Sequence, residues 1–345
     1  MHSLVMLARL WCAAMMLLVG APVAAAPAPG PRIVAIGDLH GDFAAWRSIA
    51  SDARLIDARG RWTGGRATLV QTGDVVDRGP DSLGILRDLM RLQREANRAG
   101  GRVIALVGNH EAMNVTGDLR YVPTSDFAAF ATAASPRLRE RVYARNAAAI
   151  EAAYRRGDPA ITPSAARQRW LAATPLGMLE RQAAWQPNGS IGRWIVRNPA
   201  VVMLEGTLFV HGGLSVEYAK LPLDEINRRV AASLTTRETG PEAIINDPLG
   251  PLWYRGLATR EASEQEPPAA TRPPIEEELA AVLGAYGAQR IVFGHTPVLS
   301  GIALLHGGRL ARIDTGISAH YGGKLSWLEI VDGQMVAHEV EQTGP

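Results

Sequence analysis

Cysteine is almost absent from this sequence. The single cysteine among the 345 residues is Cys12, which lies in an N-terminal segment with the features of a secretory signal peptide. A mature chain that begins after this segment contains no cysteine, and therefore no disulfide bond and no thiolate ligand for a metal ion. Catalysis through a covalent intermediate on cysteine is excluded in such a chain.

An excess of charge of either sign is also missing. The chain has 36 lysine and arginine residues and 34 aspartate and glutamate residues, which gives a formal net charge of +2. No overall field therefore draws the protein to nucleic acid or to an anionic membrane. Arginines are frequent between residues 137 and 156, but they alternate with alanine and glutamate, as on a solvated helix face. We therefore expect no nucleic-acid partner.

The apolar run near the N-terminus is too short to span a membrane. It covers residues 10–20, whereas a spanning helix needs about 20 apolar residues. A weakly basic start precedes the run and small residues follow it, an order that predicts a signal peptide at residues 1–25, cleaved after Ala25. We expect a Pro/Gly linker at 26–31, a periplasmic or secreted protein, and no membrane contact after cleavage. An uncleaved membrane anchor is the alternative.

Three short apolar runs each end in a glycine followed by a polar residue. The runs cover residues 32–36, 68–72 and 103–107, and the polar residues are Asp38, Asp74 and Asn109. These are 36 and 35 positions apart, which suits strand-helix-strand units with helices at 43–52 and 82–99. Parallel strands bring their carboxyl-end loops to one edge of a sheet, where α/β proteins bind ligands.

The rest of the chain alternates between helix-rich and strand-rich segments. Residues 116–198 are rich in alanine and arginine and are divided by prolines, which predicts an inserted cap of several helices. Glutamates and four prolines indicate an exposed loop at 259–274. Further strands are expected at 201–204, 207–210, 291–293, 311–313, 325–331 and 335–340. The last two, joined by Asp332-Gly333, are typical of a hairpin.

Metal-ligand residue types follow five of the apolar runs. They are Asp38 and His40, Asp74 and Asp77, Asn109 and His110, His211, and His295. Carboxylate, amide and imidazole groups without thiolate suit manganese, zinc or iron, and so many candidates indicate two ions that share a ligand. A single aspartate after a strand is usually a turn or helix-capping residue, but five such clusters on one rim favour a metal centre.

The same segments resemble the signatures of a known family. Three segments carry the resemblance: Gly37-Asp38-Leu39-His40-Gly41, Gly73-Asp74-Val75-Val76-Asp77-Arg78-Gly79 and Gly108-Asn109-His110-Glu111. In order and spacing they are similar to the three signatures of the phosphoprotein phosphatases, a family of the calcineurin-like superfamily. Residues 210–215 and 294–296 resemble the two remaining metal-histidine motifs of the family. Residues 250–256 and 314–323 are most similar to Shewanella-like protein phosphatases. The tail at 314–323 also occurs in symmetrical diadenosine tetraphosphate hydrolases.

The resemblance implies a fold and a metal centre. The implied fold is α/β, with two mixed β-sheets in a sandwich flanked by helices, an inserted helical cap, and a domain that covers residues 32–345. Two divalent ions are implied, with manganese expected and iron or zinc as alternatives. One ion would be held by Asp38, His40 and Asp74. The other would be held by Asp74, Asn109, His211 and His295, so that Asp74 bridges them.

Further residues acquire roles through the same resemblance. His110 would protonate the leaving oxygen while Asp77 holds its ring, because a carboxylate partner raises the pKa of an imidazole. Arg78 and Arg255 would grip the phosphate, since a planar guanidinium offers two parallel hydrogen bonds. Tyr321 is a candidate for the wall of the substrate pocket. The alternatives are a third metal ligand for His110, a turn residue for Asp77, and a stacked surface arginine for Arg255.

Three functions remain open at this level. The first is a metal-dependent phosphatase that acts on phosphoproteins, phosphopeptides or small phosphomonoesters, with phosphotyrosine as a candidate, by direct attack of water. The second is a hydrolase of dinucleoside polyphosphates. The third is a phospholigand-binding module without catalysis. The presence of every implied ligand together with His110, Asp77 and Arg78 favours an enzyme.

Overall fold

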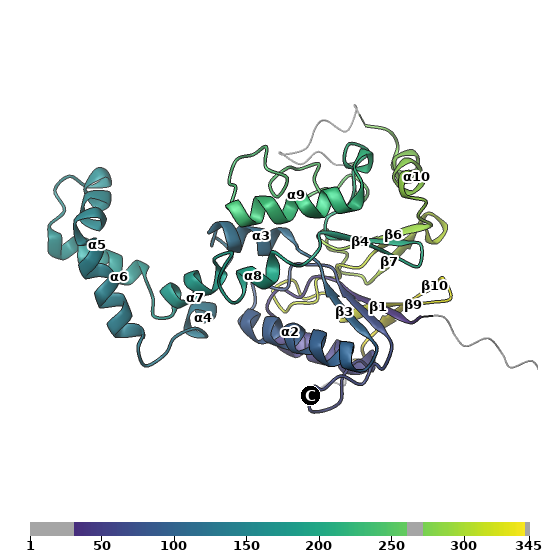
Figure 1. Ribbon diagram of the computed structural model, residues 1–345, viewed down its shortest axis with the longest axis horizontal. Coiled ribbons are helices and arrows are strands. Elements are labelled where there is room, and N and C mark those ends of the chain that lie inside the picture. Colours follow the sequence, from purple (N-terminus) through teal and green to yellow (C-terminus); the bar gives the residue numbers. More distant parts are fainter. Residues whose placement is uncertain (1–30, 261–271, 342–345) are drawn as a thin grey trace, which may run out of the picture.

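The computed structural model describes residues 31–260 and 272–341 (Figure 1). The predicted signal peptide at 1–25 and residues 26–30 of the predicted linker lie outside these ranges, as does most of the predicted loop at 259–274. Among the helices that are described, none combines the length and the apolar composition needed to cross a membrane.

The first sheet has five strands and is mixed. Its order is β10 (Gln334–Glu339), β9 (Ser326–Val331), β1 (Ile33–Ile36), β2 (Thr68–Gln71) and β3 (Arg102–Ala105). β1, β2 and β3 are parallel, as predicted, and their last residues lie opposite one another. β9 and β10 form the predicted hairpin, in which Asp332 and Gly333 both have positive φ, 49° and 75°, as a type I′ turn requires.

The second sheet also has five strands and is mixed. Its order is β4 (Val201–Leu204), β5 (Thr207–Val210), β6 (Arg290–Phe293), β8 (Leu310–Arg312) and β7 (Ala303–Leu305). β5, β6 and β8 are parallel, and the edge strands β4 and β7 are antiparallel to their neighbours. Strand β7 is not predicted from the sequence, because it is short and its residues Leu304 and Leu305 are exposed.

The two sheets face each other across an apolar layer. Ile33, Ala35 and Val70 of the first sheet pack in one cluster with Phe209 and Val292 of the second sheet. Alternate residues of the same strands join a second cluster, to which the flanking helices contribute. The strands are therefore covered on both faces, which explains why they are continuous apolar runs in the sequence.

Helices flank both sheets (Figure 1). They are α1 (Phe43–Asp52) and α2 (Ser82–Arg98) beside the first sheet, and α9 (Leu223–Thr236) and α10 (Ile275–Tyr286) beside the second. Trp46 of α1 and Ile226 of α9 are fully buried in the cluster that these helices share with the strands. The expected α/β sandwich of two mixed sheets flanked by helices is confirmed.

The inserted segment, residues 116–198, is helical, and part of it stands apart from the sandwich. It follows α3 (Asn109–Thr116) and contains α4 (Thr124–Ala128), α5 (Ser135–Gly157), α6 (Pro163–Ala173), α7 (Met178–Trp185) and α8 (Gly192–Ile195). Figure 1 shows α5 and α6 projecting away from the sheets, with α4 and α7 at the junction. We call α5 and α6 the arm. On α5 the buried residues are Ser135 and Tyr143, so most of this helix faces solvent.

Candidate active site

The predicted ligand residues meet where strands of both sheets end. Asp38 and His40 follow β1, Asp74 and Asp77 follow β2, Asn109 and His110 begin α3, His211 follows β5, and His295 follows β6. All eight side chains are buried. The backbone N–H of His295 donates to Asp38 Oδ2 at 3.1 Å, so the two sheets are joined directly at this edge.

The loop after β2 adopts a left-handed backbone conformation at several residues. Asp74, Asp77 and Arg78 have φ values of 53°, 70° and 68°. Such values are unfavourable for residues with a Cβ and are concentrated at functional sites. Gly73 has φ of 96°, and a Cβ there would lie 2.7 Å from the backbone nitrogen of Gly108. The close approach of the two loops therefore requires glycine at this position.

Glu111 holds these two loops together. Its carboxylate accepts hydrogen bonds from the backbone N–H groups of Gly108 at 2.8 Å, Asp74 at 2.9 Å and Val75 at 2.9 Å. Burial and the neighbouring Asp74 carboxylate raise the pKa of Glu111 to about 7. The three bonds satisfy backbone donors that would otherwise be buried without a partner. They fix the loop after β2 relative to the start of α3.

His40 presents one ring nitrogen to two carboxylates. Its Nδ1 donates to the carbonyl oxygen of Val76 at 3.1 Å, which leaves Nε2 with its lone pair. This Nε2 lies 4.0 Å from Asp38 Oδ2 and 3.9 Å from Asp74 Oδ2. Burial outweighs the opposing effect of Asp74 and lowers the pKa of His40 to about 4, so its ring is neutral at physiological pH. The residues predicted for the first ion therefore face one small space.

His211 and His295 lie on the other side of Asp74. The Nδ1 of His211 donates to the carbonyl oxygen of Thr72 at 2.8 Å, which again leaves Nε2 with its lone pair. That Nε2 lies 3.4 Å from Asp74 Oδ1, 2.9 Å from Asn109 Oδ1 and 3.2 Å from His295 Nδ1. The four residues predicted for the second ion therefore direct ligand atoms at one another.

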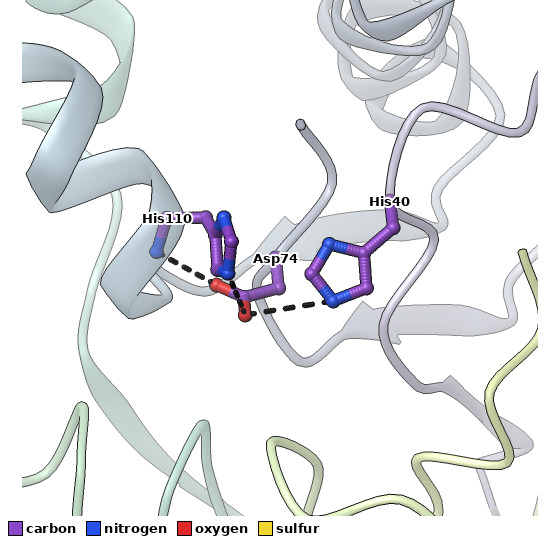
Figure 2. A group of neighbouring side chains, drawn as sticks. All are labelled: His40, Asp74 and His110. Carbon is purple, nitrogen blue, oxygen red and sulfur yellow. Dashed lines mark hydrogen bonds and ion pairs between the residues drawn. The ribbon is translucent and has the colours of Figure 1, made fainter. Parts of the chain in front are cut away.

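Asp74 is shared by two groups of ligand atoms. His40, Asp74 and His110 form one group, and Asp74, His211 and His295 form the other, each with its atoms within 4.8 Å of one another. Figure 2 shows the Asp74 carboxylate between the rings of His40 and His110. Burial acts to raise the pKa of Asp74, but the surrounding imidazoles prevail and hold that pKa well below its usual value. The shared carboxylate is therefore ionised.

This set of groups fits two divalent cations. Burial, with repulsion from Asp314 and Asp74, raises the pKa of Asp38 well above its usual value, and burial also raises the pKa of Asp314, to about 6. Buried carboxylates that repel one another are stabilised by a cation placed among them. The facing nitrogens of His211 and His295 would likewise share such an ion. Oxygen and imidazole ligands without thiolate suit manganese, iron or zinc.

His110 is paired with Asp77. The two residues are joined by a hydrogen bond of 2.7 Å between His110 Nδ1 and Asp77 Oδ2. Burial opposes protonation of the ring, but the carboxylates of Asp74 and Asp77 prevail and raise the pKa of His110. The second nitrogen, Nε2, lies 3.8 Å from Asp74 Oδ2. This nitrogen is one of the ligand atoms grouped around Asp74, so it faces the same space as Nε2 of His40.

Arg78 lies against two tyrosine rings. Its guanidinium carbon is 4.1 Å from the ring centre of Tyr121 and 5.8 Å from that of Tyr321, both within the range of cation–π contacts. The ring centre of Tyr121 is 5.1 Å from that of His110, and the ring centre of Tyr321 is 5.3 Å from that of His40. The Nε of Arg78 is buried and has no hydrogen-bond partner among the described residues. The guanidinium is thus held beside the ligand groups.

Arg255 lies close enough to His295 to influence the pKa of its ring. Its side chain is half-buried, and its charge contributes, after burial and His211, to a pKa of His295 well below the usual value. The nearby ring of Trp253 stands at 90° to the ring of His295, with 5.7 Å between the ring centres. Arg78 and Arg255, the two predicted phosphate-binding residues, are therefore both brought to the ligand cluster.

A cavity of about 580 Å³ lies beside the cluster. Tyr121 and Trp253, whose rings contact His110 and His295, both line it. Met113 and Pro248 add apolar surface, and Asn246 adds an amide. Its volume is in the range of sites that bind small molecules or side chains.

Several residues that support the ligands are not predicted from the sequence. Glu111 lies within a quoted motif but was assigned no role, and Asn114, which bonds Asp77, follows His110 by four positions, a spacing that places both on one helix face. Asp314 follows a strand, as the predicted ligands do. Tyr121 lies in the inserted segment, where no local pattern distinguishes it.

Known proteins are similar to this chain in sequence and in fold. Residues 31–299 match the calcineurin-like phosphoesterase family, which is most of the chain. The protein is therefore a member of the calcineurin-like phosphoesterase family, as the sequence motifs predicted, and this family uses a dinuclear metal site.

Within that family the chain belongs with the Shewanella-like protein phosphatases. It is 34% identical over 292 residues to Shewanella-like protein phosphatase 2 of Arabidopsis thaliana, covering 83% of this chain and 71% of that protein. It is 28% identical over 311 residues to Shewanella-like protein phosphatase 1 of Plasmodium berghei, and the match covers 89% of this chain and 73% of that protein. Its fold is similar to that of a cold-active protein-tyrosine phosphatase of a psychrophilic Shewanella species, with a TM-score of 0.63 and 22% identity. The match covers 90% of this chain and 80% of that one.

Proposed function

We propose that the protein hydrolyses phosphate monoesters on proteins or peptides, with phosphotyrosine as the preferred residue, and that two divalent metal ions assist it. The observation that carries this proposal is the shared position of Asp74, which belongs to two groups of metal-ligand atoms. We assign Asp38, His40 and Asp74 to one ion, and Asp74, Asn109, His211 and His295 to the other, with manganese expected and iron or zinc as alternatives. When bound, the ions supply Lewis acidity to the phosphoryl oxygens and to the attacking water.

His110 and Asp77 handle the proton of the leaving group. Asp77 accepts the Nδ1 hydrogen of His110, so a proton on Nε2 is directed into the site. Transfer of this proton to the leaving oxygen removes the negative charge that develops as the ester bond breaks, which is the role of a general acid. The raised pKa of His110 keeps this acid form populated.

Arg78 and Arg255 bind the phosphate. The aromatic contact with Tyr121 restrains the guanidinium of Arg78, so less side-chain entropy is lost when it binds two phosphate oxygens. Arg255 adds positive charge near His295.

The cavity beside the cluster supports an aromatic or peptide leaving group. Tyr121 and Trp253 offer ring surfaces on which a tyrosyl ring can pack, next to the proposed acid His110. Tyr321 lies against Arg78 and His40, and we propose that it borders the place where the phosphate binds. The similarity of fold to a protein-tyrosine phosphatase agrees with this substrate but does not itself assign it.

Hydrolysis of a dinucleoside polyphosphate is the second candidate, and the cavity favours it less. A polyphosphate needs several cationic groups along its length. Arg120 lines the cavity, but its Nη2 lies 2.7 Å from Asp118 Oδ2, so part of its charge is already neutralised. The third candidate is a binding module without catalysis. Such a module has no need of a proton donor, so the hydrogen bond between His110 and Asp77 does not favour it.

The test is phosphate release by metal-stripped protein that is resupplied with Mn²⁺, Fe²⁺ or Zn²⁺ separately. Phosphotyrosine peptide, phosphoserine peptide and diadenosine tetraphosphate are assayed in parallel, with Asp74→Asn as the inactive control. Metal-dependent release that is fastest from the phosphotyrosine peptide and lost in Asp74→Asn supports the proposal. Faster cleavage of the dinucleotide supports the second candidate, and no turnover with any metal supports the third.

We also propose that the protein is exported, on the basis of residues 1–25. Expression of the full chain in a bacterial host, followed by fractionation and mass spectrometry, tests this proposal. A mature protein in the periplasm that begins at Ala26 is expected. An uncleaved chain in the membrane fraction supports the anchor instead.

A further inference from the structure

A chain of buried hydrogen bonds links the inserted segment to His110. Asp77 accepts from His110 Nδ1 at 2.7 Å and, through both oxygens, from the side-chain amide of Asn114 at 3.0 Å. The same amide nitrogen lies 2.8 Å from the carbonyl oxygen of His110. The oxygen of Asn114 accepts from Nη2 of Arg181 at 2.6 Å, and Nε of Arg181 donates to Asp126 Oδ2 at 2.6 Å. Arg181 is thus linked to the proposed acid, His110, through two intervening residues, Asn114 and Asp77.

Arg181 determines which way the amide of Asn114 faces. A guanidinium has donors but no acceptor, so only the amide oxygen can face it. The amide nitrogen must then face Asp77, where it is needed as a donor. With the amide reversed, its oxygen would face the carboxylate oxygens of Asp77 and its nitrogen would face the guanidinium of Arg181. Both contacts are unfavourable in a buried site.

The position of Arg181 is itself fixed. Its side chain is 1% exposed, and its partner Asp126 is also buried at 1%. The guanidinium carbon lies 5.2 Å from the ring centre of Trp185 and 5.7 Å from that of Phe127. Arg181 is on α7 and Asp126 is on α4, the two helices at the base of the arm. The guanidinium of Arg181 is therefore held rigidly at the base of the inserted segment, where it points toward α3.

We propose that Arg181 is a positioning residue for the leaving-group proton. By holding Asn114, it holds the Asp77 carboxylate against His110 Nδ1 and keeps His110 Nε2 directed into the site. Residues that orient reacting groups through hydrogen bonds typically affect activity by about 10- to 100-fold, and Arg181 acts in this way through Asn114 and Asp77. This inference rests on the proposed function, in which His110 protonates the leaving oxygen.

The test compares substrates whose leaving groups differ in their need for a proton. An alkoxide such as that of phosphoserine leaves poorly without protonation, whereas p-nitrophenolate leaves readily. The variant is Arg181→Met combined with Asp126→Leu, because apolar replacement of a whole buried ion pair usually preserves the fold. We expect kcat for a phosphoserine peptide to fall about 10-fold or more and kcat for p-nitrophenyl phosphate to change much less, with KM nearly constant.

A matched control is available in the arm. Arg167 and Glu140 form an ion pair at 2.7 Å on the exposed surface, and Arg167→Met with Glu140→Leu likewise replaces an arginine–carboxylate pair by apolar side chains. This control is expected to leave both rates unaltered. If the Arg181 double variant does not fold, Arg181→Lys retains the buried charge while removing the planar fork, and the same rate comparison applies.

His110→Asn separates the failure of this inference from failure of the proposed function. If His110→Asn slows the phosphoserine peptide selectively but the Arg181 variants slow both substrates equally, or neither, Arg181 has no positioning role. If His110→Asn shows no selectivity for the poor leaving group, the proposed acid role is wrong and the inference is lost with it. Selective slowing in both His110 and Arg181 variants supports both.

Discussion

Asp74 contacts His110 twice, through different atoms. One carboxylate oxygen accepts a hydrogen bond from the backbone N–H of His110 at 2.9 Å, and the other lies 3.8 Å from Nε2 of the same residue (Figure 2). The backbone contact fixes the distance between the shared carboxylate and the start of α3. The proposed acid, His110, and the proposed bridging ligand, Asp74, therefore cannot move independently. A substitution that displaces one of them should also displace the other.

Metal binding should stabilise the fold. Metal-stripped protein is expected to unfold at a lower temperature than protein with excess Mn²⁺, because ligand present at 100 times its Kd adds about 2.7 kcal/mol to the free energy of unfolding. Differential scanning fluorimetry measures the shift. Asp74→Asn removes a charge common to both groups, so its unfolding temperature should respond little to Mn²⁺. An equal response in the wild type and in the variant would contradict a metal site at Asp74.

Replacement of Arg78 should weaken binding of inorganic phosphate. Arg78→Lys keeps the charge but loses the planar fork and the ring contact with Tyr121, so the inhibition constant for inorganic phosphate should rise by about 10-fold, from one strong charge-assisted pair. Arg61→Lys is the control, because Arg61 is exposed and paired with Asp57 away from the site. An unchanged inhibition constant in Arg78→Lys would remove Arg78 from the proposed phosphate site.

The apolar layer between the sheets should contribute strongly to stability. Phe209 is fully buried there, and Phe209→Ala is expected to lower the free energy of unfolding by about 3–5 kcal/mol, since it removes apolar contacts and leaves a cavity. Leu304→Ala on the edge strand β7, where the residue is 40% exposed, should cost less than about 1 kcal/mol. Urea unfolding followed by circular dichroism distinguishes the two. Similar costs would mean that Phe209 does not pack in a core layer.

The arm should be dispensable for hydrolysis of small substrates. A Cβ at Gly177 would overlap the carbonyl oxygen of Phe127 and lie 2.7 Å from the nitrogen of Ala131, so the chain enters and leaves the arm at neighbouring points. Deletion of residues 132–176 with a short glycine linker retains Asp126 and Arg181. We expect a folded protein whose kcat for p-nitrophenyl phosphate is close to that of the full chain. Loss of this activity in a folded deletion variant would show that the arm acts on the site.

Much of the fold and of the ligand set could be predicted because their signals are local. Asp38, Asp74 and Asn109 each follow an apolar run and a glycine, and parallel strands necessarily bring such positions together. The strands themselves are recognisable because both faces are covered. β7 could not be predicted in the same way, since three residues with two exposed leucines carry no periodicity.

The supporting residues could not be predicted because their partners are distant in sequence. Arg181 is 67 positions from Asn114 and 55 from Asp126, and arginines are frequent throughout the inserted segment. What distinguishes Arg181 is its burial against Asp126, and burial of one arginine among many depends on how α4 and α7 pack. Glu111 is adjacent to the ligands, but its three backbone partners are visible only once the two loops are folded together.

The hydrogen bonds of Glu111 have a consequence for how the centre acquires its ions. Because they fix the loops that carry Asp74 and Asn109 through the protein's own contacts, the ligand atoms are preorganised before any ion arrives. An ion that enters need not reshape the backbone, so exchange of one first-row metal for another should leave the scaffold unchanged. Metal choice in the cell would then follow from the supply of each metal and from how well it fits this fixed set of oxygen and imidazole ligands.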